Sequence, residues 1–130
     1  MAKKIRSIKS IITKKDFISC VLSDALYNSP WFRCKVSSST PQSLVDEARS
    51  KHDCREDIWE HILLGGGSIT IIDPEDEKTY EVDLKAFEKG FKLFMLNEPR
   101  HYGDLMNECG DFYTADALLQ TIVFGEVVYG

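Results

Sequence analysis

The sequence has 130 residues, the usual size of one domain and long enough for a single hydrophobic core. Hydrophobic residues make up 43% and charged residues 28%, proportions that exclude a wholly disordered or fibrous chain. The net charge is −5, but six of the sixteen basic residues precede Asp16, the first acid, which leaves ten bases against twenty-one acids, a net of −11. An acidic body of this kind repels nucleic-acid phosphates unless the fold segregates its charges.

The first thirteen residues form a basic arm, in which lysine and arginine repeatedly interrupt the isoleucines. These interruptions exclude the apolar stretch of a signal peptide. No later run approaches the roughly 18 to 20 apolar residues needed to span a bilayer. We therefore expect a cytoplasmic protein with no membrane segment, whose arm is a flexible tail. The four cysteines show no close pairing and are expected to be buried free thiols.

The first helices are predicted from apolar periodicity and capping signals. The isoleucines of the arm recur at steps of three and four, which suits a short helix, although a terminal strand fits as well. Thr13 and Asp16 come close to a capping box, and a helix over 14–27 is expected to follow. Pro30 ends that helix, because the residue before proline is pushed away from helical backbone angles.

Residues 31–36 alternate with a period of two, which predicts a half-buried strand. Trp31, Arg33 and Lys35 would share one side of it. Thr40 is placed to cap a helix over 41–51 with proline at its first position.

The second half of the chain is predicted to hold a hairpin and further helices. Asp53 caps a helix that the glycines at 65–67 end. Two strands follow, over 68–72 and 79–82, joined by a polar turn. The remaining predictions are a helix over 84–96 capped by Asp83, a short helix over 101–109 and a last helix capped by Thr114. The sequence therefore predicts one α+β domain over residues 1–130, with a small antiparallel sheet packed with four to six helices.

The last third of the chain carries two apolar stripes at helical spacing, over 84–94 and 115–123. The apolar tail Val127-Val128-Tyr129 follows them and is expected to be buried, either in the chain's own core or against a second copy, because it would otherwise expose apolar surface to water. The phenylalanine stripe, together with Trp31 and Phe32, offers more aromatic surface than one small sheet is expected to cover. We therefore expect a homo-oligomer, most simply a symmetric dimer.

The candidate ligand-binding residues are Arg100, His101, Trp31 and Arg33. Arg100 and His101 place a cation and an imidazole at the start of a predicted helix, where an arginine can clamp an anion and a ring can stack on a base. Trp31 and Arg33 on one strand face would form a stacking platform. Anchoring of the loop and an arginine stem lying along apolar surface are the structural alternatives for these two pairs.

No metal ion, cofactor or catalytic residue is expected. A zinc set of His52, Cys54 and His61, completed by Cys34, is disfavoured because positions 54 and 61 lie two helical turns apart. The triple glycine at 65–67 follows a helix and precedes a strand, the reverse of the order in a phosphate-binding loop. The scattered acids near the C-terminus are expected to be solvated faces and helix caps.

Two blocks at opposite ends of the sequence form a recognisable combination. They are Val21-Leu-Ser-Asp-Ala25 with Trp31, and Pro99-Arg100-His101, Thr114-Ala-Asp116, Leu119-Gln120 and Phe124-Gly-Glu-Val-Val-Tyr-Gly130. This combination resembles a group of small phage and prophage accessory proteins. The chain departs from the group at Tyr27-Asn-Ser-Pro30, where the group usually has a Glu-Gly-Gly turn.

The resemblance implies a non-catalytic accessory protein, in the host cytoplasm if phage-encoded, and of anti-defence type. Proteins of this type sequester a nucleotide signal, as the Thoeris anti-defence sponges do, or occlude a nuclease. The leading hypothesis is thus binding of a small anionic or nucleotide ligand or of a host protein. The alternatives are an acidic nucleic-acid mimic that inhibits a host DNA- or RNA-guided nuclease, and an enzyme of unrecognised class.

Overall fold

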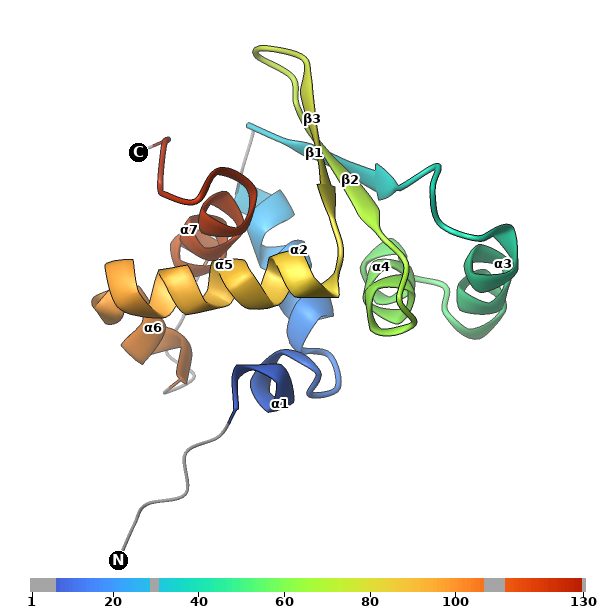
Figure 1. The fold of residues 1–130 in the computed structure, drawn as a ribbon, viewed down its shortest axis with the longest axis horizontal. Helices are drawn as coiled ribbons and strands as arrows, with labels where there is room; N and C mark the ends of the chain where they lie inside the picture. Colours follow the sequence, from blue (N-terminus) through green and yellow to red (C-terminus); the bar gives the residue numbers. More distant parts are fainter. Residues whose placement is uncertain (1–6, 29–30, 107–111, 130) are drawn as a thin grey trace, which may run out of the picture.

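The computed structural model describes residues 7–28, 31–106 and 112–129, and these form an α+β fold with seven helices and one three-stranded antiparallel sheet (Figure 1). The sequence predicted four to six helices, and the structure has one more because the short N-terminal helix is formed. The helices are α1 (Ile8–Ile12), α2 (Phe17–Asn28), α3 (Gln42–Lys51), α4 (Arg55–Leu64), α5 (Leu84–Asn97), α6 (Pro99–Met106) and α7 (Phe112–Phe124), and the strands are β1 (Arg33–Val36), β2 (Ile69–Asp73) and β3 (Lys78–Val82).

The sheet has β2 at its centre, with β1 and β3 antiparallel to it on either side. The expected hairpin is confirmed: β2 and β3 pair from Ile69 opposite Val82 to Asp73 opposite Lys78. Along β1, Arg33 is exposed and Cys34 is partly buried, which confirms the predicted alternation over that strand.

The main core lies where α2, α5 and α7 pack together, and Figure 1 shows α5 crossing the other two. The predicted phenylalanine stripe of α5 supplies its centre, because Phe87, Phe91 and Phe94 have no exposed surface. α5 approaches α7 closely at Gly90, where an added Cβ would lie 2.5 Å from the Cα atom of Ile122. A side chain at position 90 would thus force the two helices apart.

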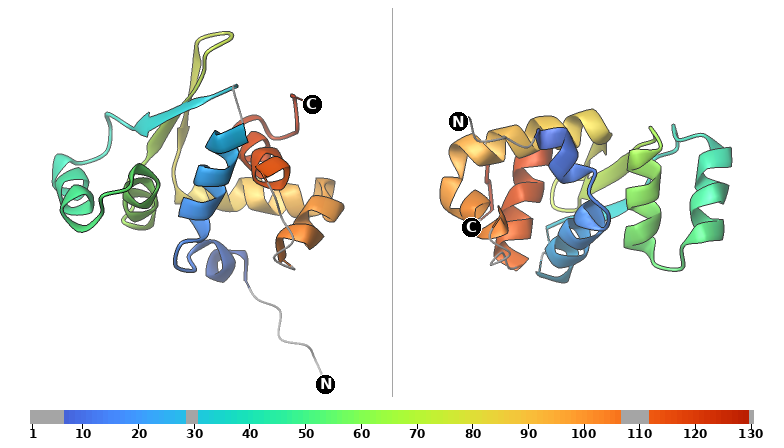
Figure 2. Two further views of the ribbon diagram at one scale, coloured as in Figure 1. Left: turned by 180° about the vertical axis from the view of Figure 1, so that it is seen from behind. Right: turned by 90° about the horizontal axis from the view of Figure 1, so that it is seen from below.

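A second, smaller apolar cluster holds α3 against α4. Val45 and Ala48 of α3 are buried against Ile62 of α4. Figure 2 shows the two helices side by side, with α3 at the end of the molecule farthest from α6. α3 therefore depends mainly on α4 for its packing.

The glycines at 65–67 end α4, as predicted. Gly66 has φ +91° and its N–H donates to Leu63, while the N–H of Gly67 donates to Ile62 at 2.8 Å. Glycine at the left-handed position satisfies the last carbonyls of the helix at no steric cost.

Several predicted helix starts are wrong. α2 begins at Phe17, with Asp16 at φ 67°, and Thr13 ends α1 instead of capping α2. The carboxylate of Glu60 in α4 caps α2: its two oxygens accept from the N–H groups of Asp16 and Ser19 at 3.2 and 3.1 Å. A cap that comes from another helix leaves no local sequence signal.

The other capping predictions have mixed outcomes. Asp83 caps α5 as predicted, accepting from the N–H of Ala86 at 2.8 Å. Thr40 does not cap α3; its hydroxyl instead exchanges hydrogen bonds with the backbone of Ser68, the residue before β2. Cys54, one residue after the expected Asp53, precedes α4, and Thr114 lies inside α7.

The C-terminal tail is docked, but its valines are not buried in the chain's own core, and their burial against a second copy stays a prediction. Val127 and Val128 remain 37% and 53% exposed. Their backbone is nevertheless fixed, because the side-chain oxygen of the buried Gln120 accepts from the N–H groups of Val128 and Tyr129 at 2.8 and 2.7 Å. Hydrogen bonding to one buried amide, rather than burial of both valines, holds the tail in place.

Two further expectations need correction. Trp31, Phe32 and the α5 phenylalanines are buried within one chain, so they offer no open aromatic surface, and the dimer stays a prediction without that support. The cysteines at 20, 34 and 54 are free, but two are exposed and the third is partly buried. The expectations for residues 1–6 and for Cys109 concern positions outside the described residues. Within the described part of the chain, no helix is both long and apolar enough to cross a membrane.

Candidate functional site

Trp31 belongs to an aromatic cluster instead of an open platform. It is 8% exposed and packs on Phe32, Phe124 and Tyr129, with ring centroids 4.4, 5.1 and 5.8 Å away. Its indole N–H donates to Asp116 of α7. The expected stacking of Trp31 with Arg33 is therefore replaced by core packing, which leaves Arg33 alone at the surface.

The other expected pair lies on α6. His101 is half-buried: its ring stacks on Phe94 with centroids 6.4 Å apart, and Nδ1 lies 3.3 Å from the hydroxyl of Thr114. Arg100 beside it is exposed. Trp31 and His101 each contact a polar side chain of α7, Asp116 and Thr114 respectively. Ligand binding at Arg100, His101, Trp31 and Arg33 stays a prediction.

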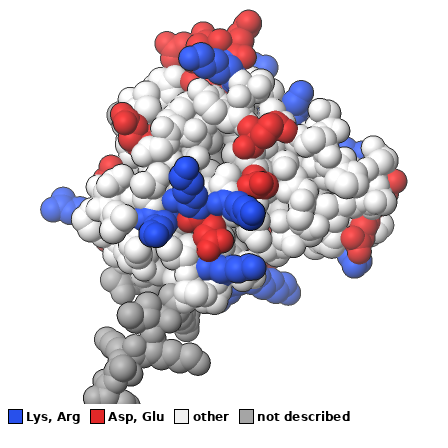
Figure 3. Space-filling view, viewed as in Figure 1, with Lys and Arg blue, Asp and Glu red and all other residues white. Residues whose placement is uncertain are grey.

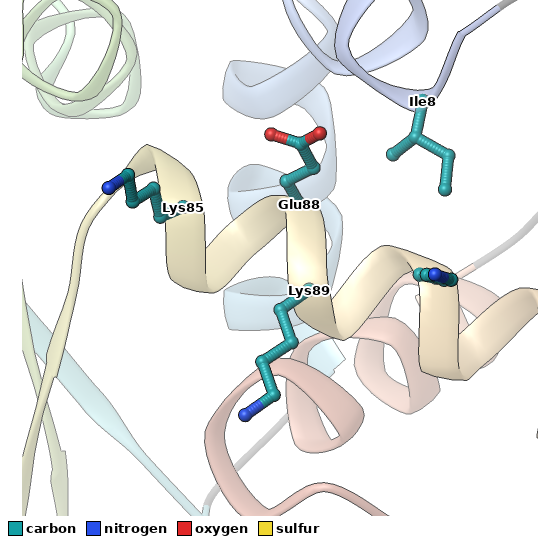
Figure 4. A pocket seen from close by; sticks show the side chains of 5 residues that line it. Ile8, Lys85, Glu88 and Lys89 are labelled. Atoms are coloured by element: carbon teal, nitrogen blue, oxygen red, sulfur yellow. The ribbon is translucent and has the colours of Figure 1, made fainter.

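A cationic hollow lies along α5, where the sequence analysis placed no site. The hollow has a volume of about 410 Å³ and is lined by Lys85, Lys89 and Lys92 with Glu88, and by Ile8 from α1. Figure 4 shows Lys85, Glu88 and Lys89 pointing from α5 in different directions, with Ile8 on the neighbouring α1. Among the described residues, none of the ion pairs involves these lysines. Long lysine stems can turn toward a ligand, so the hollow can collect several positive charges.

The lysines were visible in the sequence as a helical pattern. Positions 85, 89 and 92 recur at steps of four and three, which places them on one helix face. Like charges at this spacing destabilise a helix by about 0.2 to 0.5 kcal/mol per pair. The apolar stripe of the same helix is the stronger signal, and the lysine pattern was not predicted as a site.

A second hollow borders the first, and Lys89 lines both. It has a volume of about 350 Å³ and lies between α5 and the end of α7. Leu93, Ile122 and Phe124 line it together with Lys89 and Thr121. Two hollows therefore adjoin across one lysine side chain.

On the face drawn in Figure 3, basic side chains gather over α5 with acidic ones among them, and acidic side chains gather at the tip of the β2–β3 hairpin. Two other acids of the hairpin strands, Asp73 and Glu81, are engaged in the fold. Asp73 is 1% exposed, and Glu81 accepts hydrogen bonds from Ser37 and Thr70. The exposed tip consists of Glu75, Asp76 and Glu77 with Lys78.

A histidine pair joins α3 to α4. His52 Nε2 and His61 Nδ1 lie 3.2 Å apart, with the ring planes inclined by 62°. The other nitrogen of His61 lies 3.4 Å from a carboxylate oxygen of Glu47. Hydrogen bonds from His61 and then Lys51 hold the pKa of Glu47 below its usual value. Cys54, the third member of the rejected zinc set, donates to Glu56 instead.

Within the part of the chain that the structure describes, no three metal-ligating side chains cluster. Comparison with known proteins adds no family: no protein-family model, no curated protein and no solved structure matches this chain.

Proposed function

We propose that the protein is a non-catalytic binding protein for a small anionic ligand, and that the α5 hollow takes the ligand's charged part. The observation that carries the proposal is a set of three lysines, Lys85, Lys89 and Lys92, around one hollow that Glu88 also lines. These lysines make no ion pair within the described residues, and the chain has a net charge of −5. Three cations that repel one another gain free energy when an anion binds between them. The accessory phage role, of anti-defence type, remains part of this proposal through the sequence resemblance alone.

The adjoining hollows favour a ligand with a phosphate and an apolar ring. Phosphate oxygens would take charge-assisted hydrogen bonds from the lysines. A nucleobase would extend past Lys89 into the hollow lined by Leu93, Ile122 and Phe124. Small-molecule sites commonly combine an apolar lining with a few polar groups that fix orientation. A nucleotide is the ligand class that fits both halves.

The test is calorimetric titration of the full chain with a panel of cyclic and linear nucleotides. The substitution set Lys85→Gln, Lys89→Gln and Lys92→Gln should lower the affinity of the best ligand at least tenfold, because it removes the local positive charge. Lys35→Gln is the matched control, since Lys35 is an exposed lysine on β1 away from the hollow. The Lys35→Gln variant should bind the nucleotide with the same affinity as the wild type.

A second variant separates this site from the one predicted by sequence. Arg100→Ala should leave binding unchanged if the α5 hollow holds the ligand. Loss of binding in Arg100→Ala together with normal binding in the triple lysine variant would move the site to α6. The absence of heat with every nucleotide would reject the proposed function.

The acidic hairpin tip favours a second candidate, a nucleic-acid mimic. Glu75, Asp76 and Glu77 are exposed together at a protruding end of the molecule. Such a tip would bind a basic groove of a nuclease, and binding would weaken steeply as salt is added. Inhibition of a DNA- or RNA-guided nuclease that Glu75→Gln, Asp76→Asn and Glu77→Gln abolish, while the triple lysine variant retains it, would support this candidate over the first.

A further inference from the structure

The histidine pair between α3 and α4 has no role in the proposed anion binding, and its geometry suits another ligand. His52 is the C-cap of α3 and His61 lies in the last turn of α4, so each helix contributes one ring. The side chain of His61 is 21% exposed, which leaves a path from solvent to the pair. In the metal-free protein the two rings share one hydrogen bond, with one nitrogen donating and the other accepting.

The separation of the two nitrogens also suits two ligands of one metal ion. With zinc–nitrogen bonds of about 2.0 to 2.1 Å, tetrahedral geometry places two nitrogens about 3.3 to 3.4 Å apart. His52 Nε2 and His61 Nδ1 are 3.2 Å apart. An ion can therefore replace the shared proton with only a small adjustment of the rings.

Glu47 supplies the outer support that such a site needs. A metal-binding imidazole usually donates its second N–H to a carboxylate, which fixes the tautomer and raises the basicity of the ligating nitrogen. The Nε2 of His61 lies 3.4 Å from Glu47, so a proton held there leaves Nδ1 free to accept or to ligate. His52 would then release its Nε2 proton to solvent or carry it on Nδ1 when the ion binds.

We infer that His52 and His61 form a two-imidazole site for a divalent transition-metal ion such as Zn²⁺, Ni²⁺ or Cu²⁺, with water in the remaining positions. Imidazole is a preferred ligand of these ions. Two protein ligands give a weaker and more exchangeable site than the three or four of catalytic and structural zinc centres. Because α3 packs mainly on α4 through a small cluster, the ion would fasten α3 to the rest of the molecule.

The experiment is calorimetric titration of tag-free, chelator-treated protein with Zn²⁺. The sequence contains three histidines, which provides a matched control. His52→Gln and His61→Gln should each lower the affinity at least tenfold, whereas His101→Gln should bind as the wild type does. Glu47→Gln, the positioning residue, should lower the affinity by about tenfold, the smaller end of the effect of losing such support. Far-UV circular dichroism checks that each variant is folded.

A spectroscopic measurement on the unaltered protein identifies the ligating atoms. In imidazole ¹H–¹⁵N spectra, Zn²⁺ should shift His52 Nε2 and His61 Nδ1, while the His101 nitrogens stay in place. Unchanged His52 and His61 signals at saturating Zn²⁺ would overturn the inference. So would equal affinity in the wild type and in a folded double variant, because zinc would then be bound elsewhere.

Discussion

The hydroxyl of Tyr129 donates a hydrogen bond to Asp73, 2.7 Å away and 56 residues earlier in the chain. Asp73 is 1% exposed, and its other oxygen accepts from the N–H of Glu75 at 3.0 Å. The bond therefore links the docked tail to the end of β2 and satisfies a buried carboxylate. Buried acceptors that lose a partner are costly, so this contact is a sensitive point of the fold.

Tyr129→Phe should lower the free energy of unfolding by about 1 to 3 kcal/mol, because it keeps the ring and removes only the donor to Asp73. Urea denaturation measures the change. Tyr113→Phe is the matched control, since Tyr113 is 66% exposed, and it should have no measurable effect. Equal losses in the two variants would show that the Asp73 bond contributes nothing specific.

The same bond predicts a loss of stability at alkaline pH. The hydrogen bond to Asp73, followed by burial, raises the pKa of Tyr129 above its usual value. The folded state then retains this proton more strongly than the unfolded chain, so the stabilisation is complete below about pH 10 and declines as pH rises above it. The difference in unfolding free energy between wild type and Tyr129→Phe should shrink over that range. If the difference in unfolding free energy stays constant as pH rises, the raised pKa of Tyr129 would be contradicted.

Gly90→Ala should destabilise the protein by about 1 to 3 kcal/mol or more, because the added methyl group overpacks the contact with Ile122. Gly103→Ala is the matched control: Gly103 also lies in a helix, and an added Cβ there meets nothing within 4 Å. Because alanine has a higher helix propensity than glycine, Gly103→Ala should leave the free energy of unfolding unchanged or raise it by up to about 1 kcal/mol. Thermal unfolding of both variants would reveal any reversal of this order.

Glu60→Ala should cost about 2 to 3 kcal/mol, because it removes the charged acceptor for the N–H groups of Asp16 and Ser19. Glu60→Gln keeps one acceptor oxygen and should cost less. Chemical denaturation measures both. Glu126→Ala, at an exposed position of the tail, should be neutral. A neutral Glu60→Ala would mean that water caps α2 equally well.

Gln120→Ala should release the tail without unfolding the domain, because the amide of Gln120 holds the backbone of Val128 and Tyr129. Hydrogen exchange of those two amides should accelerate at least tenfold, while amides in α5 keep their protection. Slow exchange in the variant would show that ring packing alone fixes the tail.

Features controlled by neighbours in sequence were predictable. Asp83 caps α5 through the N–H three residues later, and Gly66 ends α4 because only its own backbone angles matter. The fold class followed from such local signals together with apolar periodicity. Tertiary partners were not predictable: Glu60 reaches α2 across more than 40 residues, and Trp31 is buried by the C-terminal tail.

The same difference between local and tertiary signals explains which candidate sites could be predicted from the sequence. The lysine face of α5 is a local pattern and was available in the sequence, since one helix positions all three cations. The pairing of His52 with His61 depends on how two helices meet across a turn, which spacing along a single helix cannot show. Trp31 was misplaced because a periodic strand pattern does not reveal that its first residue precedes the strand.

The most extensive helix contact of the fold, between α2 and α7, joins segments separated by 83 residues. During synthesis at about 5 to 20 residues per second, α2 waits roughly 5 to 19 s before the whole of α7 has been made. Over that interval α2 lacks the surface of α7, although α4, which also packs on α2, has already been made. The order of translation therefore sets the earliest time at which the core around α2, α5 and α7 can close.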